Sequence, residues 1–127
     1  MTSSLAGARL QTLVWSADIA RSEYFYSELL GLVLQGRSHG ALVYKVGEGV
    51  LRVSPVPSTS ASEHTIFGFE VADLSPVAKQ LSNAGIATER FPGFEHDEDG
   101  IWTAPDSTGV LWFRDPDGNL ISAVRYA

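Results

Sequence analysis

An internal repeat places the strongest constraint on the fold of this chain. Ala-Asp-Ile at 17–19 returns as Ala-Asp-Leu at 72–74, and Gly-Leu at 31–32 returns as Gly-Ile at 85–86. Asp before a helical run of apolar residues and Gly after it are typical helix boundaries. These signals predict two helices, over about 19–30 and 75–84, at equivalent places in two similar units.

The order of strand-like runs is also the same in both halves. One apolar run precedes each predicted helix, at 9–16 and at 64–71. Three runs follow each helix, at 32–36, 41–46 and 49–55 in the first half, and at 86–91, 101–104 with 110–114, and 119–124 in the second. Asp115-Pro116-Asp117-Gly118 has the residue types of a type I turn between antiparallel strands. The sequence therefore predicts an α+β fold made of two βαβββ modules.

Length and composition are those of one small globular domain. The chain has 127 residues, of which 44% are hydrophobic, and it has no cysteine. Disulfides, thiolate metal sites and cysteine nucleophiles are therefore excluded. The Pro- and Ser-rich stretch at 55–62 has no periodicity and is typical of a linker. We expect a single domain over 1–127, with module one at about 9–56, a linker at about 57–63 and module two at about 64–127.

Charge and hydropathy limit the kinds of partner. The net charge is −6, and the nine Lys and Arg residues form no cluster, so we expect neither nucleic acid nor a membrane as partner. No apolar run is long enough to span a bilayer, and the first residues lack the features of a signal peptide, so a cytoplasmic location is expected. A small-molecule ligand is the partner class that remains.

Two segments resemble a known superfamily. The sequence DIARSEYFYSELLGL from Asp18 and the sequence FRDPDGNLI from Phe113, in the order βαβββ twice, resemble the vicinal oxygen chelate superfamily of glyoxalases, bleomycin resistance proteins and extradiol dioxygenases. The resemblance covers essentially the whole chain. It implies an open, cup-shaped mixed β-sheet with the helices outside, and often a divalent metal. It also implies a homodimer, because members commonly close the open edge of the cup with a second chain.

The metal positions of that superfamily correspond here to Gln11, Arg52, Ile66 and Ser122. Isoleucine has no donor atom, arginine is a permanent cation, and serine is a poor neutral ligand. Only Gln11 suits a metal, so we expect neither a metal at these positions nor another cofactor. A displaced site that uses Gln11 and His64 stays open, because His64 has the same strand parity as Ile66.

Period-two alternation separates the side chains that face the cup from those that face the helices. The predicted cup residues are Gln11, Leu13 and Trp15 in the first half, and His64, Ile66, Gly68 and Glu70 in the second. Trp102 could stack on a flat ligand. A four-residue turn at 115–118 predicts that Trp112 lies on the face opposite Ser122. The acidic loop at 94–100 is expected to be solvated, with Gly93 and Gly100 as hinges.

Two hypotheses about function follow. The first is a metal-free small-molecule binding protein for a partly aromatic or anionic ligand, bound by Gln11, Trp15, Arg52, His64, Ile66, Trp102 and Ser122. Arg52 would grip an anion, unless it forms an ion pair with Glu70. The alternative is a glyoxalase-like lyase, isomerase or dioxygenase-type enzyme, with a displaced metal or with His64 and Glu70 as catalytic acid and base. The sequence does not decide whether the protein is an enzyme.

Overall fold

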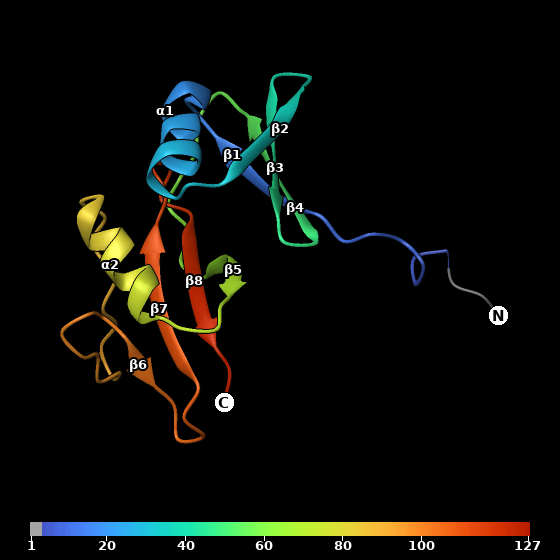
Figure 1. The fold of residues 1–127 in the computed structure, drawn as a ribbon. Coiled ribbons are helices and arrows are strands. Elements are labelled where there is room, and N and C mark those ends of the chain that lie inside the picture. Colours follow the sequence, from blue (N-terminus) through green and yellow to red (C-terminus); the bar gives the residue numbers. More distant parts are fainter. Residues whose placement is uncertain (1–3) are drawn as a thin grey trace.

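Two four-stranded mixed sheets, one from each half of the chain, form the framework of the protein (Figure 1). This computed structural model describes residues 4–127, and the start of the expected domain range, residues 1–3, lies outside the described residues. The first sheet has the order β1-β4-β3-β2 and the second has the order β5-β8-β7-β6. In each sheet the first strand pairs in parallel with the last. The predicted open α+β architecture is therefore confirmed, and we call the two halves module 1 and module 2.

The strand boundaries agree with the sequence pattern in module 1 and less well in module 2. Module 1 contains β1 (Thr12–Ser16), β2 (Val33–Ser38), β3 (Ala41–Val46) and β4 (Gly49–Pro55). Module 2 contains β5 (Thr65–Glu70), β6 (Trp102–Thr103), β7 (Gly109–Arg114) and β8 (Leu120–Arg125). The predicted strand at 86–91 is wrong. Only Thr88 of that run makes a bridge, to Phe113, and the edge of the sheet continues at β6.

One helical segment follows the first strand of each module. The first is α1 (Ile19–Glu23), which continues without a break as the π-helix η1 (Tyr24–Leu29); the second is α2 (Ser75–Asn83). Asp18 caps α1 by accepting a hydrogen bond from the backbone N–H of Arg21. Gly31 and Gly85 end the two segments with φ angles of 72° and 74°. The extents of both helices are as predicted, but the π-helical part was not predicted. No helix in the described part of the chain is long and apolar enough to cross a membrane.

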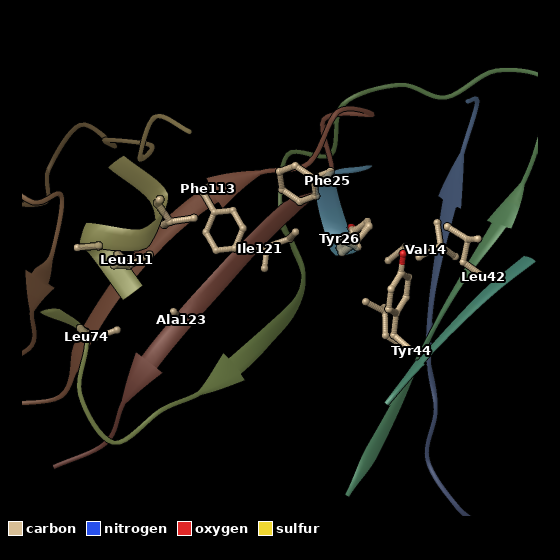
Figure 2. Packing of buried hydrophobic residues seen from close by; sticks show 14 residues of the cluster. Val14, Phe25, Tyr26, Leu42, Tyr44, Leu74, Leu111, Phe113, Ile121 and Ala123 are labelled. Carbon is tan, nitrogen blue, oxygen red and sulfur yellow. The ribbon is translucent and has the colours of Figure 1, made fainter. Parts of the chain in front are cut away.

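A single hydrophobic core joins the two modules. Figure 2 shows Tyr26 beside Tyr44 of module 1, and Phe25 beside Phe113 of module 2. Val14 and Ser16 point into this side of β1, whereas Leu13 and Trp15 are exposed on the other side. The predicted alternation in β1 is therefore confirmed. Since both helical segments pack on the core side, the opposite face of each sheet is free of helices, and we call it the open face of that module.

The turn between β7 and β8 fastens module 2 to module 1. Gly118 N–H donates to the carbonyl of Asp115, as expected for the predicted type I turn. The buried carboxylate of Asp115 accepts a hydrogen bond of 2.6 Å from the Tyr26 hydroxyl. The buried carboxylate of Asp117 accepts from Ala17 N–H at 2.8 Å and from the Thr59 hydroxyl at 2.7 Å. The carboxylates therefore connect the turn to η1, to the residue before the N-cap of α1 and to the linker.

Candidate functional site

The open face of module 1 combines a cation with exposed apolar side chains. In the sheet register, Arg52 of β4 stands between Leu13 of β1 and Val43 of β3. Residues paired in this way point to the same side of a sheet. Trp15 lies one side-chain position further along β1, paired with Ser54. Leu13 and Trp15 are 51% and 56% exposed, so a half-buried guanidinium lies beside an accessible apolar surface.

Arg52 has no carboxylate partner among residues 4–127. One of its terminal nitrogens, Nη2, donates a hydrogen bond of 3.0 Å to the backbone carbonyl of Ser38. Among the residues that the structure describes, the ion pairs are formed by Arg21, Arg37 and Arg114. The ion pair between Arg52 and Glu70, which the sequence left open as an alternative, is therefore absent from this part of the chain. Most of the guanidinium donors of Arg52 stay available to an anion.

The corresponding row of module 2 is formed by Gly68, Ser122 and Trp112, which pair across β5, β8 and β7. Trp112 therefore lies on the same face as Ser122, and the prediction of the opposite face is wrong. The reason is the connection between β7 and β8: Asp115 N–H also donates to the carbonyl of Asn119, so the loop has one residue more than a four-residue turn. Ser122 is buried, because Gly68 has no side chain and leaves room for its hydroxyl.

An aromatic cluster that the sequence pattern did not predict borders the open face of module 2. The ring of Phe94 lies 4.9 Å from that of Trp102 and 5.9 Å from that of Trp112, between centroids. Phe91 packs edge-on against Trp112 at 5.3 Å. Phe94 is 42% exposed, and a shallow groove runs beside it. The available signal was the recurrence of aromatic residues at 91, 94 and 102 around a Pro-Gly pair.

His96 holds the loop that carries these rings. Its Nε2 accepts a hydrogen bond from Phe91 N–H at 3.1 Å, and its Nδ1 lies 2.8 Å from the carbonyl of Gly100. This pair of contacts fits the neutral ring protonated at Nδ1. The Asp97 carboxylate accepts from the backbone N–H groups of Asp99 and Ile101. The acidic residues of the loop are exposed as expected, and Asp97 stabilises the turn.

The four superfamily metal positions do not form a suitable donor set. Gln11 is exposed just before β1, and Arg52 presents a cation. Ile66 is 45% exposed and has no donor atom, while the Ser122 hydroxyl is buried against Gly68. No group of three or more His, Cys, Asp or Glu side chains within residues 4–127 is arranged to hold a metal ion. The residues present therefore do not fit the divalent metal of the superfamily.

His64 and Glu70 lie at opposite ends of β5. His64 is exposed just before the strand and Glu70 is its last residue. Six residues of extended chain separate them by about 20 Å, at roughly 3.3 Å per residue. The two side chains are therefore too far apart to act as acid and base on the same proton. His64 and Gln11, the alternative metal pair, likewise share no hydrogen bond in the described part of the chain.

The two modules meet beside β1 and β5. A small cavity of about 140 Å³ is lined by Thr12 and Val50 from module 1 and by Phe67 and Gly68 from module 2. In the described residues, no side-chain hydrogen bond or ion pair joins one open face to the other. The predicted ligand residues thus lie in two groups. Gln11, Trp15 and Arg52 belong to module 1, whereas module 2 contributes the others, His64, Ile66, Trp102 and Ser122.

Comparison with known proteins agrees with this architecture. The chain is similar to the structure of lactoylglutathione lyase from Agrobacterium tumefaciens, with 17% identity, a TM-score of 0.72, and 94% of this chain and 93% of that chain covered. It is also similar to a glyoxalase family protein from Enterococcus faecalis, with 19% identity, a TM-score of 0.70, and 93% and 97% covered. No curated protein matches. The family model described as Glyoxalase/Bleomycin resistance protein/Dioxygenase superfamily matches residues 9–123. The chain therefore belongs to this superfamily, which includes the vicinal oxygen chelate proteins that the sequence resembles.

Proposed function

We propose that this protein binds a small aromatic carboxylate on its open faces without a metal. The observation that carries the proposal is Arg52, a half-buried cation without a carboxylate partner in the described part of the chain. A guanidinium can hold a carboxylate through two parallel hydrogen bonds, and such charge-assisted bonds are stronger than neutral ones. Arg52 therefore supplies the anion-binding end of the proposed site.

Leu13 and Trp15 supply the apolar surface for the ring of the ligand. Leu13 is the direct neighbour of Arg52 across β1 and β4, and Trp15 follows on the same face. A few polar groups on an otherwise apolar surface are the usual composition of a small-molecule site. In this proposal, Ile66, Trp102 and Ser122 extend the surface across module 2, and Gln11 and His64 border it.

In this proposal, the site binds its ligand without a metal ion. At the four superfamily ligand positions the chain has a cation, an apolar side chain, a buried hydroxyl and a single amide. Binding is therefore expected to survive treatment with EDTA, and the melting temperature should not change.

The proposal can be tested by calorimetric titration with benzoate as the probe. Replacing Arg52 with Ala removes a charge-assisted contact that contributes on the order of 1.5–3 kcal/mol, so benzoate should bind roughly ten- to hundredfold more weakly. Arg52→Lys should recover only part of the affinity, because lysine keeps the charge but lacks the planar fork.

Arg37→Ala is the matched control. Arg37 belongs to β2 of the same sheet but forms an ion pair with Glu23 on the helix side. This variant should bind benzoate like the wild type. If Arg52→Ala stays folded and binds benzoate unchanged, or if Arg37→Ala weakens binding equally, Arg52 is not the anion-binding group.

We also propose that the protein is a homodimer in which a second copy closes the open edge of the sheets. The proposal is supported by the exposed apolar residues Leu13, Trp15 and Ile66 on β1 and β5, each of which lies at an edge of its sheet. Contiguous exposed apolar surface often marks an interface. Light scattering at micromolar concentration should give twice the mass of the chain, and a monomer would contradict this proposal.

A further inference from the structure

A second cavity lies on the core side of the sheets, away from the open faces. It has a volume of about 130 Å³ and is partly open to solvent. Leu30 and Leu32 line it from module 1, and Val77 and Leu81 of α2 from module 2, above Phe113 of β7. Because Phe113 points to the face opposite Trp112, this cavity is separate from the site of Arg52 and from the aromatic cluster.

The lining is apolar except for one amide. Gln80 provides the only polar side chain among the nine lining residues. Its Nε2 donates hydrogen bonds to the carbonyls of Leu29 and Leu30, at 3.1 Å and 2.9 Å, where the first helical segment ends. The amide donors are therefore satisfied by the protein itself, so the cavity presents apolar walls to a ligand. A charged molecule would lose its hydration there without compensation.

The two helices differ in the side chain at the position of Gln80. Tyr26 and Leu81 occupy equivalent places, because the carbonyl of each accepts the closing hydrogen bond of its helix, from Leu32 and from Ile86. The residues just before them, Phe25 and Gln80, are therefore equivalent too. Phe25 is buried, with its ring 6.5 Å from that of Phe113. In module 2 an exposed glutamine takes the place of this phenyl ring.

We propose that this cavity is a second binding site, for an uncharged apolar molecule about the size of one benzene ring. The size supports this ligand class, because an apolar protein cavity of roughly 150 Å³ stays dry and binds benzene or xenon. The half-buried side chains Leu30, Leu32 and Val77 stand around the cavity. The site accepts apolar rings and excludes carboxylates, so it is distinct from the proposed benzoate site in position and in chemistry.

Methyl NMR with benzene as the probe tests the proposal directly. Benzene should shift the methyl signals of Leu30, Val77 and Leu81 in a saturable way. The methyl signals of Leu42 and Val53, which are buried in module 1 away from the cavity, should not move. Benzoate at the same concentrations should leave the methyl signals of Leu30, Val77 and Leu81 unchanged, and this separates the cavity from the site of Arg52.

Two substitutions of Gln80 complete the test. Gln80→Phe restores the residue type of the equivalent position in module 1 and should weaken benzene binding at least about tenfold. Gln80→Ala removes the same hydrogen bonds without filling the space, so it should bind benzene within roughly threefold of the wild type. Unshifted cavity methyls in the wild type, equal shifts in Leu42 and Val53, or wild-type affinity in folded Gln80→Phe would each overturn the proposal.

Discussion

The two modules follow one plan but differ by one residue in their helices. In module 2 the closing hydrogen bond runs from Ile86 N–H to the carbonyl of Leu81, which spans five residues (81 to 86). In module 1 the corresponding bond runs from Leu32 to Tyr26 and spans six (26 to 32). The extra residue lies in η1, where Leu30 N–H reaches the carbonyl of Phe25. A helix can thus absorb an insertion as a π-helical turn while both of its ends stay in place.

The edges of the two sheets also differ. In module 1 the edge strand β2 pairs with β3 over six residues, with one bulge. In module 2 the same place is divided between Thr88, which faces Phe113, and β6, which pairs with the other end of β7. The chain between these two parts carries Phe91, Phe94 and His96. Module 2 thus has an interrupted edge strand, and the chain at the interruption forms the aromatic cluster beside its open face.

The largest difference in unfolding free energy is expected between two variants, each of which lacks one residue of one helical segment. Deletion of Lys79, which is exposed in α2, turns Leu81 about 100° away from the core and should cost about 3 kcal/mol of unfolding free energy or more. Deletion of Glu28, which is exposed in η1, should cost less than about 1 kcal/mol, because the shortened segment gains the five-residue closure of module 2. Urea unfolding measures both. Equal losses would show that η1 does not act as an absorbed insertion.

The part of the fold that the sequence predicts is the part determined by local patterns. The alternation of Val14 and Ser16 with Leu13 and Trp15 shows directly which face of β1 is buried. The Asp and Gly boundaries locate both helices for the same reason. The π-helical turn has no separate residue signal; the extra residue is visible only as a change in the spacing between the two repeats.

The errors come from features that depend on tertiary contacts. The run 86–91 has the composition of a strand, but Phe91 turns away to pack on Trp112. The predicted face of Trp112 is wrong because one additional loop residue, accommodated at Gly118 with a φ of 82°, reverses the expected parity. The face of Arg52 follows from alternation, whereas Ile66 lies at a bulge of β5, where the register shifts. The distance between the two residues depends on how the two sheets pack, which periodicity does not determine.

A second comparison concerns the turns that join the last two strands of each module. The turn of module 2 carries Asp117, whose buried carboxylate accepts hydrogen bonds from Ala17 and Thr59. The turn of module 1 carries Glu48, which is exposed. Asp117→Ala leaves these donors without their acceptor and should lower the unfolding free energy by about 2–3 kcal/mol. Glu48→Ala should change it by less than about 0.5 kcal/mol.

Urea unfolding of both variants decides whether the contacts of the second turn hold the modules together. Asp117→Asn keeps one acceptor oxygen and should lie between the wild type and Asp117→Ala. If Asp117→Ala and Glu48→Ala are equally stable, the buried carboxylate adds no net stability and the two turns are equivalent after all.

The smallest effect concerns the equivalent core residues Tyr26 and Leu81, of which only Tyr26 can ionise. Burial raises the pKa of Tyr26 above its usual range, and the adjacent Asp115 charge and the hydrogen bond to it act in the same direction. Tyr26→Phe removes this hydrogen bond and should lower the unfolding free energy at neutral pH by about 1 kcal/mol. Asn119 still donates to the same Asp115 oxygen, which limits the loss.

The raised pKa of Tyr26 also determines how the unfolding free energy changes with pH. In the unfolded chain a tyrosine loses its proton near pH 10, while the buried Tyr26 keeps it. The stability from Tyr26 is therefore complete below about pH 10 and falls above it, by up to about 1.4 kcal/mol per pH unit. Tyr26→Phe should remove this part of the alkaline slope and leave the part due to Tyr44, whose pKa is also raised by burial. Tyr24→Phe, at an exposed position of the same helix, should keep the wild-type slope, and an equal change in both variants would rule out Tyr26 as the source.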